Sequence, residues 1–363
     1  MKLRVLIAED SLTVRKRLSE ILSTDPDVQV VGEAEDGGQA IELCRALKPD
    51  VITLDMMMPV MSGLAAAEYI MAYCPTPILV VSSSFNRGEL YKTYDALAAG
   101  VVEVMEKPSA DRMEDEWESR FIKMVKLVAR IKPITHLRGR LSRKYTLETP
   151  PHPQPQSPSI AAQEVPDDAR IIRIAAIGAS TGGPRALVDI LRSLPVDFAL
   201  PLLVVVHIGD PFGDTFAQWL DGQSAHRVRL ARDGDPVPAR GVVLAPSGRH
   251  LLVHKGRLAL SDQPERHSCR PSVDVLFESI AEEYGQAAVG CLLTGMGQDG
   301  GSGLLAMRRA GGVTIAQDEA TSAVYGMPRE AALLGAAQQV LPLPDIAPAL
   351  ARIASRLGHG NPP

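Results

Sequence analysis

The chain has 363 residues, of which 45% are hydrophobic and 22% charged, and its formal net charge is −5. This length suggests two domains of a soluble globular protein, and the negative charge excludes no fold but gives no reason to expect a nucleic acid or an anionic membrane as partner. Aromatic residues make up only 4% of the chain, so its cores must be built from aliphatic side chains, which suits parallel α/β sheets.

The cysteines and the N-terminal residues indicate the cellular compartment of the protein. Four cysteines are widely spaced without a Cys-x-x-Cys pair, which argues against a zinc site: Cys44, Cys74, Cys269 and Cys291. The N-terminal apolar stretch is too short for a signal peptide, and the chain has no apolar run long enough to span a membrane. We therefore expect a cytoplasmic protein without membrane insertion.

Residues 1–130 alternate short apolar runs with amphipathic stretches. The apolar runs predict strands at Arg4–Ala8, Val28–Val31, Val51–Leu54, Ile78–Ser82 and Val101–Met105, and the stretches between predict helices near 12–24, 37–47, 63–73, 88–98 and 113–131. Strands alternating with helices predict a parallel sheet with helices on both faces.

Charged side chains follow these strands. Glu9 and Asp10 follow the first strand, Asp55 the third and Lys107 the fifth. Ligands of open parallel sheets bind beyond the carboxyl ends of the strands, so these side chains should converge. Clustered carboxylates repel one another unless a cation joins them, and oxygen ligands beside a phosphate suit Mg²⁺. The alternative is that these acids cap the helices that follow the strands. Helix capping would explain Asp10 alone, but it does not explain the full set, in which Ser82 also ends the fourth strand.

In this pattern, residues 1–130 resemble the receiver domain of two-component response regulators, which implies a flavodoxin-like five-stranded parallel sheet. The resemblance implies that Asp55 accepts a phosphoryl group from a histidine kinase. It also implies a magnesium site formed by Asp10, Asp55 and the Met57 carbonyl, with Glu9 beside them. Ser82 and Lys107 would contact the phosphoryl oxygens. Val104 stands where many receivers carry Tyr or Phe, which puts the usual aromatic switch in doubt.

Residues 131–170 are predicted to be a linker, first basic and then rich in proline. Nine Lys or Arg residues and no acid lie between Arg120 and Lys144, and residues 150–166 contain six prolines. Such a composition favours extended structure with no apolar face to bury. The basic run is interpreted as a solvated helix end, and a docking segment for an acidic partner is the alternative.

A second α/β pattern occupies residues 171–358. Apolar strands are predicted at 172–177, 202–206, 288–293 and 312–316, as in a doubly wound Rossmann-like sheet. Residues 227–262 instead contain short alternating runs between Pro and Gly turns, including Val242–Leu244. They are predicted to form a small antiparallel β insertion.

The motif Gly178-Ala-Ser180-Thr-Gly182-Gly183 follows the first of these strands. It fits a nucleophile elbow, Gly-x-Ser-x-Gly, and also a plain strand-to-helix turn. A dinucleotide loop is disfavoured, because Ser180 stands where a glycine must let the pyrophosphate approach. A serine nucleophile needs a base, and His207 alone among the histidines ends a parallel-type apolar strand.

The remaining groups of a hydrolase can be assigned by position. Asp299, in a glycine-rich loop after another strand, would orient His207, although it could instead cap a helix. The backbone N–H groups of Thr181 and Met296 are the expected oxyanion-hole donors. The order Ser180, His207, Asp299 differs from that of the α/β-hydrolases, in which the acid precedes the histidine. No metal is needed at this site.

The second half resembles the catalytic domain of the CheB family, the protein-glutamate methylesterases of chemotaxis. Five segments carry the resemblance: Ile177–Pro184, Ala245–His250, Arg270–Phe277, Leu293–Gly300 and Ala316–Arg329. It implies a phosphorylation-activated hydrolase that removes methyl groups from glutamate methyl esters on chemoreceptor cytoplasmic helices and deamidates specific glutamines there. It also implies a chemotaxis-type histidine kinase as phosphodonor and Ser180, His207 and Asp299 as the triad. Val206 and Ile208 stand where many members have Gln and Met. The alternative is a non-catalytic output module that binds a partner.

Overall fold

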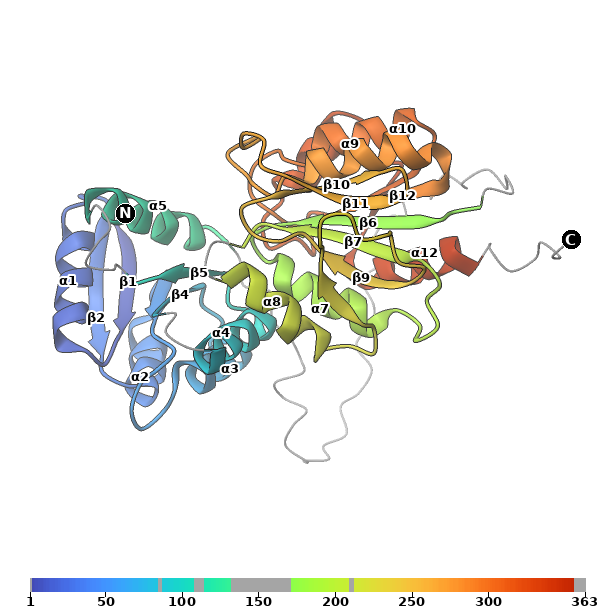
Figure 1. Cartoon of the computed structure of the whole chain (residues 1–363). Coiled ribbons are helices and arrows are strands. Elements are labelled where there is room, and N and C mark those ends of the chain that lie inside the picture. Colours follow the sequence, from blue (N-terminus) through green and yellow to red (C-terminus); the bar gives the residue numbers. More distant parts are fainter. Residues whose placement is uncertain (1, 84–86, 108–113, 132–170, 209–211, 356–363) are drawn as a thin grey trace, which may run out of the picture.

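The structure, a computed structural model, describes residues 2–83, 87–107, 114–131, 171–208 and 212–355 (Figure 1). Its N-terminal sheet has five parallel strands in the order β2-β1-β3-β4-β5. The strands are β1 (Leu3–Ala8), β2 (Val28–Ala34), β3 (Val51–Leu54), β4 (Ile78–Ser82) and β5 (Glu103–Glu106). The helices are α1 (Leu12–Ser23), α2 (Gly37–Leu47), α3 (Gly63–Tyr73), α4 (Arg87–Ala99) and α5 (Glu114–Val128). The predicted parallel sheet is confirmed, and its last strand begins later than expected.

Alternation along the strands fills two cores. In β1, Leu6 and Ala8 face the layer that contains α2, α3 and α4, whereas Val5 and Ile7 face the layer that contains α1 and α5. Short polar residues start several helices by accepting a backbone N–H bond with their side chains. Ser11, Asp36 and Ser62 do so at α1, α2 and α3. These caps therefore follow the carboxyl ends of β1, β2 and β3.

The C-terminal sheet has seven strands in the order β14-β13-β12-β6-β7-β9-β8, all paired in parallel. The strands are β6 (Ile174–Ala179), β7 (Pro201–Val206), β8 (Val228–Leu230), β9 (Gly241–Leu244), β12 (Ala288–Leu292), β13 (Val313–Gln317) and β14 (Gln339–Leu341). The helices are α7 (Gly183–Ser193), α8 (Phe212–Asp221), α9 (Val273–Tyr284), α10 (Gly301–Arg309), α11 (Met327–Leu333) and α12 (Leu343–Ser355), with a 3₁₀ turn at Gly285–Ala287. The chain reverses its direction of winding at β6, where α/β sheets place their sites.

The small antiparallel insertion expected within residues 227–262 is confirmed, but its expected extent is wrong. Residues 242–244 lie in β9, which pairs in parallel with β7, and not in an antiparallel insertion. The antiparallel pair is smaller and consists of β10 (His250–His254) and β11 (Arg257–Ser261). Short apolar runs reveal a strand but not its direction, because direction depends on partners distant in sequence.

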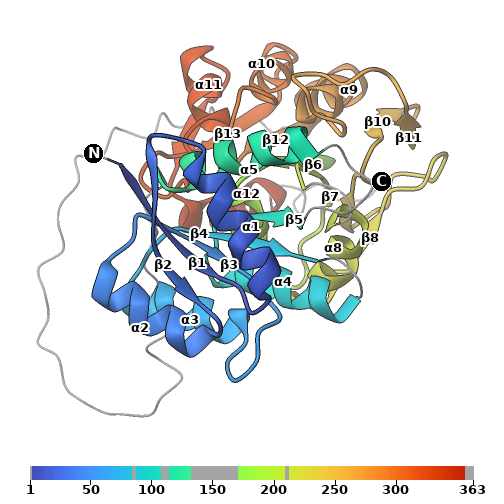
Figure 2. The ribbon, with the colours of Figure 1, turned by 90° about the vertical axis from the view of Figure 1, so that its left-hand side faces the viewer.

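The two halves pack against each other through α4, which contacts α7 and α8 (Figures 1 and 2). The ring of Tyr94, which has no exposed surface, lies 5.4 Å from that of Phe216 and 5.5 Å from that of Trp219. The Tyr94 hydroxyl donates to the Phe212 carbonyl, and Trp219 Nε1 donates to Asp95 Oδ1 at 2.9 Å. These contacts join helix α4 of the receiver-like half directly to helix α8 of the second half.

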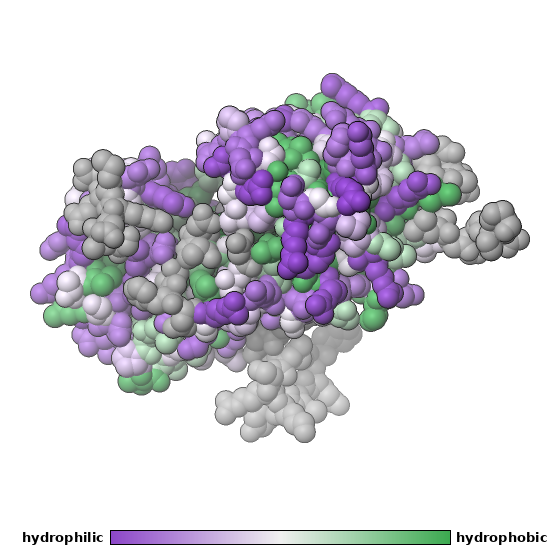
Figure 3. Space-filling view, viewed as in Figure 1, coloured by the Kyte–Doolittle hydropathy of each residue, from purple (hydrophilic) through white to green (hydrophobic). Residues whose placement is uncertain are grey.

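The predicted linker falls almost entirely outside the described residues, so the domain boundaries stay predictions. On the face seen in Figure 3, hydrophilic and hydrophobic residues are interspersed, as is usual for protein surfaces. Among the described helices, none combines the length and the apolar composition needed to cross a membrane.

Candidate active sites

The charged residues predicted at the first sheet do converge. Lys107 Nζ lies 2.8 Å from Glu9 Oε2 and 3.0 Å from Asp55 Oδ2, and both acids are buried. Burial raises the pKa of Glu9 and of Asp55, although Lys107 opposes the shift. Burial lowers the pKa of Lys107, but the two carboxylates outweigh it and the pKa is raised. The pocket thus holds two desolvated acids against one cation.

The same pocket fits a magnesium ion. Oxygen atoms of Glu9, Asp10 and Asp55 lie within 4.8 Å of one another, an all-oxygen set of the kind that hard cations take. The Met57 backbone N–H donates to Asp55, which places that peptide beside the carboxylate, and the Met57 side chain is exposed. Ser82 is buried on the neighbouring strand, where its carbonyl accepts from the Lys107 N–H at 3.0 Å.

In the second sheet, Ser180 directly follows β6 in a turn that requires glycine. Gly182 has φ +76°, and a Cβ there would lie 2.6 Å from Cβ of Ala323. The Gly183 N–H donates to the Ser180 carbonyl at 2.7 Å, and the Ser180 N–H donates to the Thr294 carbonyl at 3.0 Å. The serine is therefore held at a sharp strand-to-helix turn, as the elbow interpretation expects.

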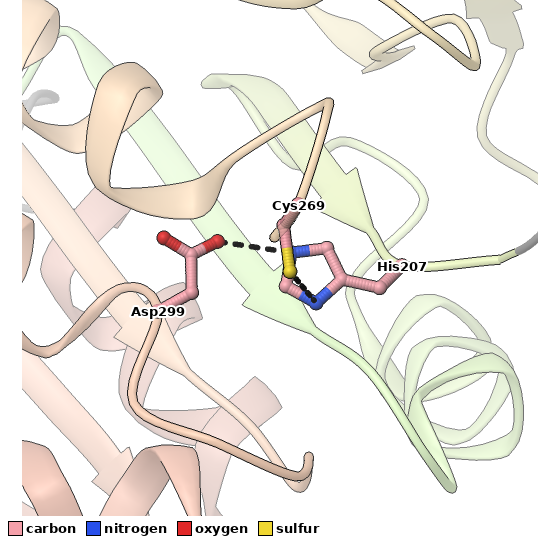
Figure 4. Close-up of side chains that lie close together, drawn as sticks. All are labelled: His207, Cys269 and Asp299. Atoms are coloured by element: carbon pink, nitrogen blue, oxygen red, sulfur yellow. Dashed lines mark hydrogen bonds and ion pairs between the residues drawn. The ribbon is translucent and has the colours of Figure 1, made fainter. Parts of the chain in front are cut away.

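His207 and Asp299 form a hydrogen-bonded pair (Figure 4). His207 Nε2 lies 2.9 Å from Asp299 Oδ2, and Cys269 Sγ lies 3.7 Å from the other ring nitrogen, Nδ1. In the neutral imidazole, the Asp299 carboxylate favours the tautomer with the proton on Nε2 and the lone pair on Nδ1. Burial alone would lower the pKa of His207, but its contacts with Asp299 and Cys269 raise it to about 9.

Asp299 is held charged by the start of α9. Its carboxylate accepts from Ser272 Oγ at 2.7 Å and from the backbone N–H groups of Val273 at 2.7 Å and Asp274 at 3.2 Å. Burial would raise the pKa of Asp299, yet the bonds with His207 and with this helix terminus lower it. Asp299 does not cap the helix that follows it, because Gly300 is the N-cap of α10.

Ser180 and His207 line one cavity of about 20 Å³, room for a single water molecule. The cavity lies between the two sheets and is lined by Leu97, Val102, Glu103 and Val104 from the receiver-like half and by Ser180, Gly182, Pro184, His207, Ile208 and Phe212 from the other. Ile208 thus faces the cavity, whereas Val206 is buried in the core.

The two expected oxyanion donors differ in setting. Thr181 is buried, and its hydroxyl donates to Glu103 Oε2 of β5 at 2.7 Å. The Met296 side chain is 54% exposed, in a loop where Gly297 has φ +88°. Within the described parts of the chain, neither backbone N–H is engaged in a hydrogen bond. Neither residue lines the small cavity.

Sequence reasoning missed three residues of this site: Glu103, Cys269 and Ser272. Ser272 had a usable signal, because a serine directly before an apolar helix pattern is a typical N-cap. Glu103 and Cys269 had none, since each meets the site only through contacts with residues distant in sequence.

Comparisons with known proteins decide the family. Residues 175–350 match the family described as CheB methylesterase, and residues 5–116 match the response regulator receiver domain. A protein-glutamate methylesterase/protein-glutamine glutaminase of Anaeromyxobacter dehalogenans is 43% identical over 348 residues, 96% of each chain. The chain belongs to the CheB methylesterase family.

A second relative of similar length agrees with this assignment. The protein-glutamate methylesterase/protein-glutamine glutaminase of Symbiobacterium thermophilum is 42% identical over 96% of each chain. Among solved structures, the Thermotoga maritima CheB methylesterase catalytic domain is 36% identical, with a TM-score of 0.48, and the match covers 50% of this chain and 98% of that one. Because one chain matches both families, this protein is a CheB family member that carries a receiver domain.

Proposed function

We propose that this chain hydrolyses glutamate methyl esters on the cytoplasmic helices of chemoreceptors, releasing methanol, and deamidates specific glutamines there. The observation that carries the proposal is the His207–Asp299 pair, with His207 lining one cavity with Ser180. A non-catalytic output domain would have no need of a buried, helix-stabilised acid on the histidine. The proposed domains are residues 1–130, 131–170 and 171–358, in a cytoplasmic protein.

The proposed chemistry is acyl transfer through serine. Ser180 Oγ attacks the ester carbonyl while its proton passes to His207 Nδ1. The protonated imidazole then delivers the proton to the leaving methoxide, which departs as methanol, or to the leaving amine of a glutamine, which departs as ammonia. Water activated by His207 hydrolyses the glutamyl-enzyme and restores the Ser180 hydroxyl.

Asp299 supports both proton transfers. It accepts from Nε2, so it selects the tautomer with its lone pair on Nδ1 and stabilises the imidazolium that forms. The backbone N–H groups of Thr181 and Met296 are the proposed donors to the tetrahedral oxyanion. Since Met296 lies in an exposed loop, substrate would complete that half of the oxyanion hole.

The receiver half is proposed to regulate this site. Asp55 would accept a phosphoryl group from a histidine kinase, and Ser82 and Lys107 would contact its oxygens. Mg²⁺, held by Asp10, Asp55 and the Met57 carbonyl with Glu9 nearby, would neutralise the phosphoryl charge. Leu97, Val102, Glu103 and Val104 of the receiver half line the cavity beside Ser180, so the docked receiver would obstruct substrate there. Phosphorylation would loosen this docking.

Methanol release tests the proposal directly. A panel of methylated receptors would be incubated with the full chain, with and without a small-molecule phosphodonor. Wild type should release methanol faster with the phosphodonor, and Ser180→Ala should release none beyond background. Equal rates for wild type and Ser180→Ala would overturn the hydrolase proposal. An active wild type that the phosphodonor leaves unchanged would overturn the regulatory part alone.

A further inference from the structure

The loop that precedes α9 brings a thiol to the catalytic histidine. Cys269 Sγ lies 3.7 Å from His207 Nδ1, and Cys269 is partly exposed to solvent. The loop is fixed by a pair of backbone bonds between Arg266 and Cys269, at 2.9 and 3.1 Å. His267 and Ser268, which lie inside that pair, have positive φ values of 53° and 59°. The thiol is therefore presented to the imidazole by a defined turn.

The separation of the two atoms fits a zinc site. Zinc binds Cys sulfur at about 2.3 Å and His nitrogen at about 2.0–2.1 Å, so two ligands at a tetrahedral angle lie roughly 3.6 Å apart. The observed sulfur–nitrogen distance is 3.7 Å. The spacing of the two atoms is therefore that of a Cys–His pair sharing one zinc ion.

Asp299 completes this arrangement from the far side of the ring. Metal-bound histidines usually donate their other ring N–H to a carboxylate, which fixes the tautomer and raises the ligand's basicity. Asp299 stands in that relation to His207 Nε2 at 2.9 Å. Although its oxygens lie near the same cluster, Asp299 already accepts from Ser272 Oγ and two backbone N–H groups, so it acts as an outer-sphere partner and not as a ligand.

We propose that His207 Nδ1 and Cys269 Sγ form a site for Zn²⁺, or another thiophilic divalent cation, that inhibits the hydrolase. Binding releases to solvent the thiol proton and, when the imidazole is protonated, the Nδ1 proton as well. It forms the zinc–sulfur and zinc–nitrogen bonds, with water in the remaining positions. The metal occupies the lone pair that takes the Ser180 proton, so the bound enzyme cannot activate its nucleophile. The inhibitory effect rests on the proposed hydrolase function, whereas the binding site does not.

The choice of cation follows from ligand chemistry. A thiolate with an imidazole favours zinc, cobalt or cadmium, whereas the all-oxygen cluster at Asp55 favours Mg²⁺. The two halves of the chain would therefore respond to different metal ions. The cysteine spacing alone predicts no zinc site; the two ligands lie 62 positions apart and meet only in the fold.

Cobalt binding tests the site without any reference to catalysis. Co²⁺ added to the reduced full chain should produce a thiolate-to-cobalt charge-transfer band that saturates at one ion per chain and disappears when Zn²⁺ is added. Cys74→Ser, which removes a partly exposed thiol elsewhere, should keep the band, and Cys269→Ser should lose it. No saturable band in wild type, or an unchanged band in Cys269→Ser, would overturn the site.

Methanol release then tests the inhibition. The zinc concentration that halves each protein's own zinc-free rate should rise at least about tenfold in Cys269→Ser, the smallest change expected for losing even an outer-sphere partner. Cys74→Ser should match wild type, and Mg²⁺ at the same concentration should not inhibit. A cobalt band without measurable methanol release would refute the proposed function but not the site. Equal zinc sensitivity in Cys269→Ser and wild type would refute the inhibitory role.

Discussion

Tyr94→Ala should release the receiver from the hydrolase. Tyr94 lies in α4 and is fully buried, with its ring against Phe216 and Trp219 and its hydroxyl bonded to the Phe212 carbonyl. Truncating a buried aromatic side chain costs about 3 kcal/mol at the low end of the usual range. If that cost falls on the docked state, the ratio of open to docked chains rises roughly a hundredfold.

Methanol release from a methylated receptor would measure the change. We expect unphosphorylated Tyr94→Ala to be as active as phosphorylated wild type, and to gain nothing from a phosphodonor. Tyr73→Ala is the matched control, because that tyrosine is 54% exposed on α3. A Tyr94→Ala protein with wild-type circular dichroism, wild-type basal rate and full phosphodonor activation would refute the reasoning that docking through α4 restrains the enzyme.

Three further predictions concern single side chains. Burial raises the pKa of Glu103, so the docked state binds the carboxyl proton more tightly than the undocked state does. Docking should therefore be strongest in acid and should weaken as the pH rises from about 4.5 through the raised pKa. The basal rate of wild type relative to Glu103→Gln, which cannot titrate, should therefore increase across that window, and a constant ratio would contradict the assignment. Ser272→Ala removes the N-cap of α9 and a hydrogen-bond donor to Asp299. It should lower the free energy of unfolding by about 2 kcal/mol and reduce kcat, and an unchanged urea denaturation curve would count against this prediction. Asp55→Ala should abolish activation by a phosphodonor but keep basal methanol release, and activation that survives would place the phosphorylation site elsewhere.

Strong local patterns made most of the fold predictable. Val51–Leu54 and Ile78–Ser82 were predicted with the observed bounds, since each is a buried run ended by a polar residue. Helices that begin with a polar cap, such as the one after Asp36, were equally clear. Strand direction was not, and β9 was therefore placed in the wrong sheet.

The site was predictable where its residues end strands of a parallel sheet. Ser180 and His207 follow adjacent strands, β6 and β7, so their approach could be expected from topology. Glu103 could not be expected, because its contact with Thr181 depends on how two separate sheets dock. No periodicity or motif encodes the relative placement of two such bodies.

The position of the receiver at the start of the chain has a consequence for biosynthesis. Domains generally fold as units in the order in which the ribosome delivers them. The strands that surround Asp55 are complete well before Asp299 emerges, and without Asp299 the histidine has no orienting partner. Under the proposed regulation, the restraining domain is therefore complete before the hydrolase site can form.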